Sequence, residues 1–358
     1  VPDPKPKVKY PTNEHPIQSF VWADFAVEPG NIYKYKVVPV FNKPLDLKYG
    51  DELKITVKVE PLGDKKHEIH FNRGTAASQA YAERFDNLAP NDKSLTEKEK
   101  QERLTWLSRG LFKAVCSFIR QAKGNGWGLR AALYELDQLD VMKEFKDAQD
   151  NGADVKIIYE ARKDEKQTKD NEDVLKQAGF KVNDRKTTYA RKNTYGIPHN
   201  KFIVLLKDKK PLMVWTGSTN ISMGGIFGHS NVGHCVKDTD VAAEYLKYWN
   251  LLSGDPLKED LKKEVDKNWP TLTANQIPND KMTVIFSPRK GNKMLDTYAE
   301  IFGSAEEIAC ITLPFNLDER FSVKLEAESN AIRYILLNSG KKQSDIAKKF
   351  NPDPDVIV

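Results

Sequence analysis

The segment from residue 195 to residue 222 limits the fold of this chain more than any other part of the sequence. It contains two apolar runs, Phe202–Leu206 and Leu212–Trp215, separated by the short polar stretch Lys207–Lys210. Two apolar runs joined by so few polar residues predict a β-hairpin with a tight turn. A hairpin would hold the residues just before its first strand close to those just after its second strand.

Polar residues of distinct chemistry lie at these two ends of the predicted hairpin. His199 and Lys201 come at the start of the first strand, and Gly217, Ser218 and Asn220 follow the second. Side chains alternate between the faces of an extended strand, so we expect His199 and Lys201 on one face. A tight turn at Gly217, which has no Cβ, would bring Ser218 and Asn220 beside them. A nucleophile, a cation and two hydrogen-bonding groups would then surround a space of the size of one phosphate.

This arrangement resembles the signature of the phospholipase D superfamily, H-x-K-x4-D followed by G-S-x-N. Leu206 stands where the superfamily usually has the Asp, and Asp208 comes two residues later. In the superfamily that Asp supports the site without touching phosphate, so the resemblance leaves Asp208 as a candidate supporting residue. Ser230 stands where many members have the Glu of a Glu-Asn pair, which leaves Asn231 as a further supporting candidate. His229 and His234 are the nearest candidates for the proton donor to the leaving group, and His229 is favoured because Gly228 makes its loop flexible.

The periodicity of the chain after residue 100 predicts an α/β fold, because helical and strand patterns alternate. The resemblance covers about residues 100–340 and implies a phospholipase D-like mixed sheet flanked by helices. Residues 87–103 are charged and are expected to form a loop. The expected helices are 104–119, 139–149 and 173–178, and the expected strands are 129–136, 155–159 and one that begins at Phe180.

A second passage repeats the order of these elements. It consists of a strand at 284–286, a helix at 294–302, a strand at 308–313, a charged helical stretch and a strand at 331–336. An internal repeat predicts two pseudo-repeated lobes. The second lobe is expected to be incomplete in this sequence, because His199 is the only histidine with Lys two places on. Superfamily members generally pair two such motifs, so the resemblance implies a second half-site from a missing C-terminal segment, a companion fragment or a homodimer.

Four segments are expected in the domain organisation. Residues 1–15 are polar and Pro-rich and predict a disordered leader. Residues 16–75 contain short runs of Val, Tyr, Ile and Phe between Pro and Gly turns, which predict a small β-sandwich. Residues 100–255 would form the first lobe, and residues 280–358 the start of the second.

The histidines and cysteines outside the motif suggest no metal or disulfide chemistry. His67 and His70 are three residues apart on a predicted strand, so their side chains would point to opposite faces as ordinary surface or edge residues. Cys116, Cys235 and Cys310 lie far apart in apolar stretches, which predicts buried free thiols.

The composition is that of an ordinary soluble protein, with 39% hydrophobic and 30% charged residues among 358. No apolar run approaches the roughly 18 to 20 residues that a membrane-spanning helix needs. The first residues have no hydrophobic signal core, so the protein is expected to be cytoplasmic, or secreted after removal of a leader. A net charge of +5 with interleaved Lys and Glu predicts only mild attraction to polyanions.

The resemblance implies a metal-independent phosphodiesterase without a cofactor. His199 would attack phosphorus to form a phosphohistidine, and Lys201 and Asn220 would bind the non-bridging oxygens. Ser218 would help to orient these phosphate-binding groups. The motif segment has no carboxylate cluster that would hold a metal ion.

Three functions remain open from the sequence. The first is a phospholipase D-type enzyme that hydrolyses or transfers a phospholipid head group, which the long, two-lobed chain with its additional β domain favours. The second is a nuclease of the same superfamily that cleaves DNA or RNA, which the modest basic excess favours. The third is a non-catalytic phosphate-binding protein, because the motif is incomplete.

Overall fold

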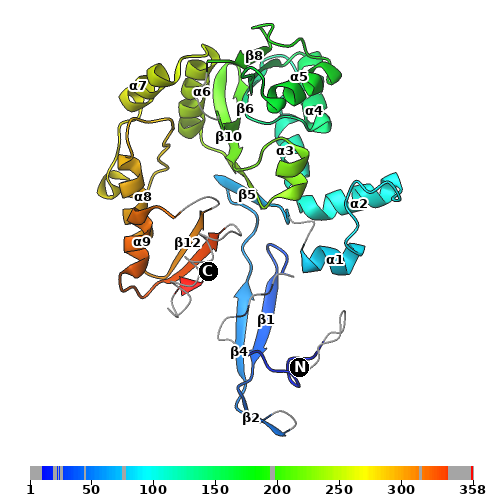
Figure 1. The fold of residues 1–358 in the computed structure, drawn as a ribbon, viewed down its shortest axis with the longest axis vertical. Helices are drawn as coiled ribbons and strands as arrows, with labels where there is room; N and C mark the ends of the chain where they lie inside the picture. Colours follow the sequence, from blue (N-terminus) through cyan, green and yellow to red (C-terminus); the bar gives the residue numbers. More distant parts are fainter. Residues whose placement is uncertain are drawn as a thin grey trace. The chain divides into compact units, whose positions relative to one another are not determined.

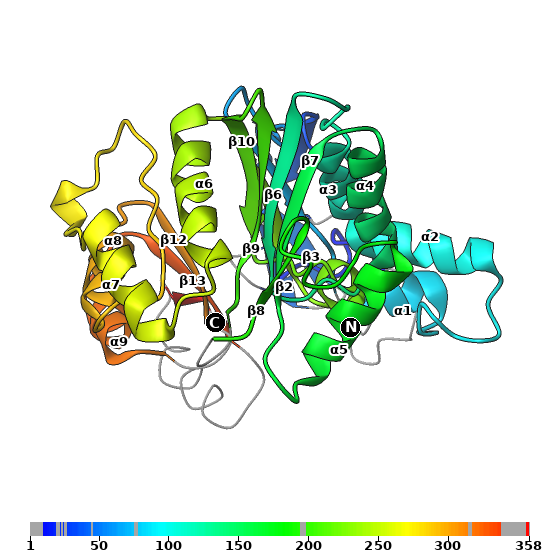
Figure 2. The same cartoon turned by 90° about the horizontal axis from the view of Figure 1, so that it is seen from above.

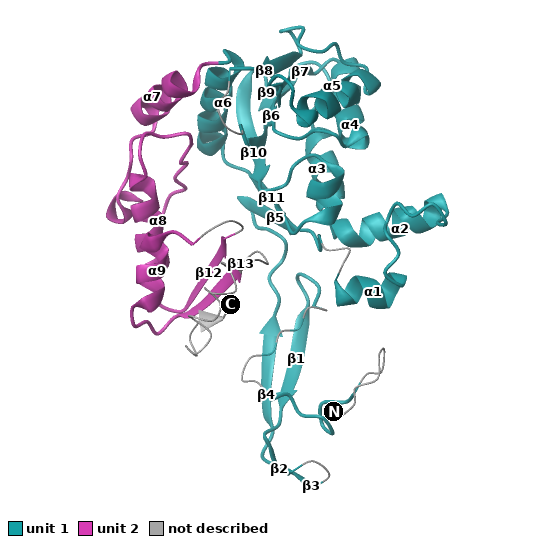
Figure 3. Cartoon of the chain, viewed as in Figure 1, with its two compact units in different colours: residues 1–255 teal, residues 256–358 magenta. Residues whose placement is uncertain are grey.

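The computed structural model divides the chain into two compact units, residues 1–255 and 256–358, which Figure 3 colours separately. Residues 1–9 of the predicted leader, residues 195–197 of the motif segment and residues 338–355 of the predicted second lobe lie outside the described part of the structure. The described residues are 10–18, 22, 24, 27–43, 46–74, 78–193, 198–313, 317–337 and 356–357.

A seven-stranded mixed sheet organises the first unit. Its three strands β6, β7 and β8 are parallel, and the remaining neighbours pair antiparallel. The mixed α/β fold predicted from the sequence is therefore confirmed. In spatial order the strands are β5 (His67–Phe71), β11 (Val232–Val236), β10 (Lys210–Gly217), β9 (Lys201–Lys207), β6 (Trp127–Leu133), β7 (Asp154–Glu160) and β8 (Thr188–Arg191).

Helices cover both faces of this sheet (Figures 1 and 2). Helices α3 (Leu111–Ile119), α4 (Leu139–Asp150) and α5 (Lys166–Gln177) lie on one face, and α6 (Thr239–Ser253) lies on the other. Each helix buries an apolar stripe, as in α4, where Val141, Met142, Phe145 and Ala148 recur at helical spacing. Strand β9 is buried on both faces because it lies in the middle of this layered arrangement.

The prediction of a loop over residues 87–103 is wrong from residue 97 onward, because α2 (Glu97–Ser108) begins at Glu97. Thr96 and Glu99 form a capping box, in which the Thr96 hydroxyl accepts from the Glu99 backbone N–H and the Glu99 carboxylate accepts from the Thr96 N–H. This polar start hides the helix from a search for apolar periodicity. A short helix, α1 (Gln79–Phe85), precedes it.

Two predicted strands are absent from the described residues. Phe180 lies in a loop, and β8 begins only at Thr188, because the Asp184 carboxylate accepts backbone N–H groups of residues 186–188 and turns the chain. Residues 284–286 also pair with no strand. Phe286 instead packs edge-on against Trp269, with 4.7 Å between ring centroids.

The β-sandwich predicted for residues 16–75 is not confirmed. Strand β1 (Ile32–Val37) pairs only with β4 (Leu53–Lys58), and β2 (Val40–Lys43) pairs only with β3 (Asp46–Tyr49). Most side chains of these strands are exposed, so the described residues form no second layer. Strand β5 joins the seven-stranded sheet instead. Before these strands, residues 11–15 form a turn in which the His15 N–H donates to the Pro11 carbonyl at 3.0 Å.

The second unit repeats part of the first. Its order α8, β12, α9, β13 follows that of α3, β6, α4, β7, and β12 pairs parallel with β13 as β6 does with β7. Its core contains Phe302, Phe321 and Leu325. The elements are α7 (Lys258–Asn268), a short 3-10 helix (Ala274–Gln276), α8 (Lys293–Gly303), β12 (Ile308–Leu313), α9 (Glu319–Glu326), β13 (Ile332–Leu337) and β14 (Val356–Ile357).

The cysteines are all free thiols, but they differ in burial. Cys116 and Cys235 are buried as predicted, whereas Cys310 is exposed. The prediction fails for Cys310 because alternate residues of β12 face opposite sides, and Ala309 takes the buried one. No helix in the described ranges has the length and apolar character needed to cross a bilayer.

Replacing Asn171 by Leu tests the packing of α5 against the sheet. The Asn171 amide is fully buried; it donates to the carbonyls of Tyr134 (2.9 Å) and Glu160 (3.1 Å) and accepts from the Leu136 N–H (3.0 Å). Leucine would leave these backbone groups unpaired, so we expect the free energy of unfolding to fall by about 2–4 kcal/mol in urea titrations. The control Gln177→Leu, exposed on the same helix, should change it by less than about 0.5 kcal/mol.

Candidate active site

The predicted hairpin is present as strands β9 and β10. Its turn residues Asp208 and Lys209 both have positive φ, of 49° and 65°, as two-residue hairpin turns require. In the ladder Ile203 lies opposite Trp215, so the same register continued by two residues places Lys201 beside Gly217. The two halves of the sequence motif therefore meet at one end of the hairpin.

Gly217 allows the chain to turn sharply at the end of β10. Its φ is +132°, and a Cβ there would lie 2.2 Å from the Val232 carbonyl oxygen, so a larger residue would collide with β11. The turn lets the Ser218 N–H donate to that carbonyl at 3.0 Å. The Ser218 hydroxyl donates to Asn231 Oδ1 at 2.8 Å and accepts from the Val232 N–H at 3.1 Å.

Asn72, which sequence reasoning missed, holds the loop that carries Asn231. Its buried side-chain amide donates to the carbonyls of Ile226 and His229, each at 2.8 Å, and its oxygen accepts from the Asn231 N–H at 2.7 Å. The loop contains a short π-helix, Gly224–Gly228. No motif marks Asn72, because it lies far from this loop in sequence and follows directly after β5.

Tyr134 connects the two charged or titratable residues of the first motif. Its ring lies edge-on to the exposed His199 ring, with 5.0 Å between centroids, and 5.5 Å from Lys201 Nζ. Its backbone N–H donates to the Asn200 carbonyl at 2.9 Å. Lys201 is buried, and its ammonium donates to the His199 carbonyl at 3.1 Å.

Glu135 connects His199 and Lys201 with the Gly217–Asn220 half of the motif. The sequence analysis did not identify this residue. Its carboxylate accepts from Asn220 Nδ2 at 2.7 Å and from the Ser222 hydroxyl at 3.0 Å. Asn220 Oδ1 is buried and has no hydrogen-bond partner among the described residues. Glu135 is 85 positions from Asn220, so no spacing rule in the sequence could have paired them.

Burial and neighbouring charges set the protonation of the site. The pKa of His199 lies below its usual value, first because of desolvation and second because of the Lys201 charge, while Glu135 acts in the opposite direction. Desolvation lowers the pKa of Lys201 to about 8, again against the effect of Glu135. At neutral pH this leaves His199 largely uncharged and Lys201 largely protonated.

The described contacts do not place the side chain of Asp208 or His229 beside His199, Lys201 and Asn220. Asp208 lies in the β9–β10 turn, at the far end of a seven-residue strand, roughly 20 Å from the Lys201 end. The His229 ring lies against Gly224, 3.5 Å from where a Cβ would be, and no described hydrogen bond or ring contact joins it to His199. Supporting roles for these two residues therefore stay predictions, and the described contacts of His229 at the site are those of its backbone carbonyl.

His67 and His70 do not converge, as their strand spacing predicts. His67 Nδ1 lies 3.0 Å from His234 Nε2, whereas His70 is buried, bonds to Glu68 and stacks on Trp215. Within the described ranges no group of three or more His, Cys, Asp or Glu side chains is placed to hold a metal ion.

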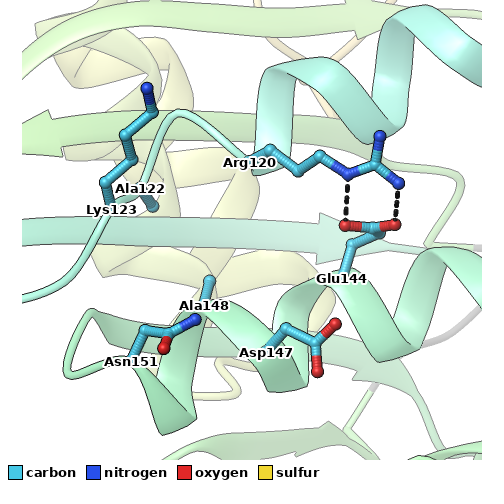
Figure 4. A pocket seen from close by; sticks show the side chains of 7 residues that line it. All are labelled: Arg120, Ala122, Lys123, Glu144, Asp147, Ala148 and Asn151. Carbon is cyan, nitrogen blue, oxygen red and sulfur yellow. Dashed lines mark hydrogen bonds and ion pairs between the residues drawn. The ribbon is translucent and has the colours of Figure 1, made fainter.

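A surface cavity of about 310 Å³ lies beside α4 and the chain that follows α3 (Figure 4). Arg120 and Glu144 form a two-point ion pair beside it, so its most evident cation is already neutralised. It is lined by Arg120, Ala122, Lys123, Glu144, Asp147, Ala148 and Asn151.

His199, Lys201 and Asn220 together have the functional groups that binding and attack of an anionic substrate require. A largely neutral imidazole can act as a nucleophile, while an ammonium group and a carboxamide can bind negatively charged oxygens. Glu135 and Tyr134 orient these groups.

Comparison with known proteins supports a family for the central part of the chain. Residues 115–252 match the family described as "Cardiolipin synthase, PLD-like domain". No curated protein is significantly similar to the chain. Among solved structures, the phospholipase D family member Nuc from Salmonella typhimurium is 23% identical over 39% of this chain and 84% of its own, with a TM-score of 0.32.

Two further structures are similar to parts of the chain. NucT from Helicobacter pylori is 20% identical over 40% of this chain and 87% of its own, with a TM-score of 0.32. Phosphatidylserine synthase from Haemophilus influenzae is 14% identical over 64% of this chain and 60% of its own, with a TM-score of 0.43.

Replacing Gly217 by Ala tests the turn at the site. The positive φ and the approach of the Val232 carbonyl should lower the free energy of unfolding by about 1–3 kcal/mol, measured by thermal denaturation. Gly228→Ala is the matched control, because a Cβ there meets nothing within 4 Å and should change stability by less than about 0.5 kcal/mol. Equal stability of the two variants would contradict the close approach.

Proposed function

We propose that this protein is a phosphodiesterase that reacts through a phosphohistidine at His199, and the match of residues 115–252 to a family described as a PLD-like domain supports this. The observation that carries the proposal is the connection of His199, Lys201 and Asn220 through Tyr134 and Glu135. It joins a nucleophile with two phosphate-binding groups from separate parts of the sequence.

In the proposed first step, the lone pair of a His199 ring nitrogen forms a bond to phosphorus. The bond between phosphorus and the leaving alcohol oxygen breaks, and that oxygen takes a proton. The lowered pKa of His199 favours this step, because a neutral imidazole has the free lone pair that an imidazolium lacks. Water or an alcohol then attacks phosphorus and gives its proton to the group that had protonated the leaving oxygen, and the bond to nitrogen breaks.

Lys201 and Asn220 would stabilise the negative charge that builds on the phosphoryl oxygens. Lys201 has three N–H donors and uses one on the His199 carbonyl, which leaves two for phosphate. Asn220 Nδ2 has two hydrogens and uses one on Glu135. Ser218 is bonded to Asn231 and would orient the turn that carries Asn220.

Glu135 is proposed as a positioning residue. Its two hydrogen bonds fix the Asn220 amide and the Ser222 hydroxyl, and its charge raises the pKa values of both His199 and Lys201. This keeps the partly desolvated ammonium protonated in the physiological range.

The proton for the leaving oxygen is proposed to come from a second half-site. Superfamily members place a second motif opposite the first, supplied by another lobe or another subunit. For this protein the second half-site would belong to a second copy of the chain, a companion fragment or further sequence. The recurrence of α3, β6, α4 and β7 as α8, β12, α9 and β13 supports a two-lobed arrangement.

We propose a phospholipid as substrate, with hydrolysis or transfer of its head group. The support is the description of the matching family, which names cardiolipin synthase, an enzyme whose product is a phospholipid. Turnover of phosphatidylcholine vesicles and of single-stranded DNA can be compared directly. Cleavage of the nucleic acid alone would assign the protein to the nuclease alternative.

The variant His199→Asn tests the proposed nucleophile. We expect turnover of bis(p-nitrophenyl) phosphate to fall by at least about 10³-fold, because asparagine cannot form the covalent intermediate. Phosphate binding should change far less, since Lys201 and Asn220 remain. Alkaline quenching and mass spectrometry should detect a phosphorylated His199 in the wild type alone.

The control His67→Asn removes an imidazole that is bonded to His234, outside the motif, and should retain turnover. EDTA should leave the wild-type rate unchanged, because the charge is stabilised by Lys201 and Asn220. Retention of turnover in His199→Asn would contradict the mechanism. Phosphate binding by the wild type without any detectable turnover, little changed in His199→Asn, would favour a phosphate-binding protein.

The pH profile tests the electrostatic role of Glu135. Wild-type activity should fall above pH of about 8 as Lys201 loses its proton, and should also fall at acid pH as His199 becomes protonated. In Glu135→Gln both limbs should move to lower pH, because the carboxylate that raises both pKa values is absent. We expect kcat to drop by about 10- to 100-fold through the loss of Asn220 orientation.

Glu135→Asp should restore part of the rate and move the limbs back toward the wild-type pH. Asp140→Asn, which removes an exposed carboxylate on α4, is the control and should leave the profile unchanged. An unshifted upper limb in Glu135→Gln would show that Glu135 does not act on Lys201.

A further inference from the structure

The two-stranded ladder of β1 and β4, which we call the β1–β4 ribbon, has two chemically different faces. Directly opposed residues of an antiparallel pair share a face, so the register places most apolar side chains on one face and all the lysines on the other. The pairs Tyr33–Val57, Tyr35–Ile55 and Val37–Leu53 form an apolar face, whereas Ile32–Lys58, Lys34–Thr56 and Lys36–Lys54 form a basic face.

The apolar face is open to solvent. Leu53 is 70% exposed, and Ile55 and Val37 are each 55% exposed. Only the tyrosines are partly covered, since the Tyr35 hydroxyl donates to Asp24 at 3.0 Å and the Tyr35 ring lies edge-on to Trp22. Trp22 itself is 59% exposed, so it extends the apolar face without closing it.

The basic face has an excess of positive charge. Four lysines project from it, and Glu52 bridges two of them, Lys36 and Lys54, at 2.5 and 2.7 Å. The pKa of Glu52 lies below its usual value because of these two bonds, which keeps the carboxylate charged. The other two, Lys34 and Lys58, form no ion pair with a carboxylate among the described residues.

We propose that the β1–β4 ribbon docks on an anionic phospholipid surface, with Leu53, Ile55 and Val37 inserted among the lipids. A surface element with apolar and aromatic side chains on one face and lysines on the other has the composition of interfacial membrane anchors. The ribbon is a single layer of backbone, so its lysines stay within about 10 Å of the lipid phosphates, the screening length at 0.1 M salt. Their long apolar stems also allow the ammonium groups to reach toward the phosphates.

A second copy of the chain or a nucleic acid would explain fewer features of the β1–β4 ribbon than a lipid surface does. A ladder of six residues in two strands covers about 20 by 10 Å, or roughly 200 Å² on each partner, against about 800 Å² in a stable dimer. A nucleic acid would use the lysines of the basic face but would leave the apolar face in water. A lipid surface accounts for both faces.

This inference goes beyond the proposed activity and does not depend on it, because it concerns binding alone. It is tested with the full chain by co-sedimentation with vesicles of equal parts phosphatidylglycerol and phosphatidylcholine, and with vesicles of phosphatidylcholine only. We expect clear binding to the anionic vesicles, a decrease of tenfold or more without the anionic lipid, and a strong decrease at high salt.

The double variant Leu53→Asp, Ile55→Asp should reduce partitioning onto anionic vesicles by at least about tenfold. Ile32→Asp is the matched control, since Ile32 is 63% exposed on the same ladder but lies on the basic face. It should reduce partitioning much less. Turnover of the soluble substrate bis(p-nitrophenyl) phosphate and the thermal unfolding temperature should be the same in both variants, which separates docking from activity and folding.

Two results would overturn the proposal. One is equal vesicle binding by the wild type and the Leu53→Asp, Ile55→Asp variant. The other is a concentration-dependent dimer, seen by analytical ultracentrifugation, that this double variant abolishes, because the apolar face would then belong to a second copy of the chain. Loss of the enzymatic activity with vesicle binding retained would affect only the function proposed above.

Discussion

The arrangement of the site depends on one set of hydrogen bonds, those that join the end of β6 to the turn after β10. Glu135 uses its side chain to accept from Asn220 and its backbone carbonyl to accept from the Ile221 N–H at 3.0 Å. The Gln138 N–H donates to the Ile221 carbonyl, also at 3.0 Å. Because backbone and side-chain bonds act together, Asn220 cannot move without opening this junction.

The junction also explains how a lysine can be buried beside a histidine. Desolvation alone favours a neutral amine, and the pKa of Lys201 is correspondingly low, at about 8. The Glu135 charge, the Tyr134 ring and the His199 carbonyl all favour the ammonium form. These groups are already in place, so little reorganisation would be needed when a phosphoryl group arrives. The same desolvation that weakens the cation would strengthen its interaction with phosphate.

The sequence predicted those parts of the fold that short-range patterns determine. The β9–β10 hairpin follows from two apolar runs and a short polar turn. The sharp turn after β10 follows from the backbone freedom of Gly217. Short-range patterns could not predict contacts between residues that are far apart in the sequence. Asn72 and Glu135 reach the site through strands β5 and β6, and only the strand order of the sheet shows that these strands end near the motif.

The failures of the sequence analysis have the same physical origin. A capping box began α2 where no apolar periodicity exists, and Phe286 found an aromatic partner in Trp269 where a strand was expected. Asp208 lies in the predicted hairpin turn, and the extended strand β9 separates it from Lys201 by its full length.

The lysines of the β1–β4 ribbon show what composition alone does not describe about a surface. A net charge of +5 spread over 358 residues predicts only weak attraction to polyanions. The register of β1 and β4 instead gathers four lysines on one face of a six-residue ladder and places apolar side chains on the other. Electrostatic attraction falls off within about 10 Å at 0.1 M salt, so the local density of charge determines binding to a surface. Pairing register, which alternates side chains with a period of two, therefore decides what this region can bind.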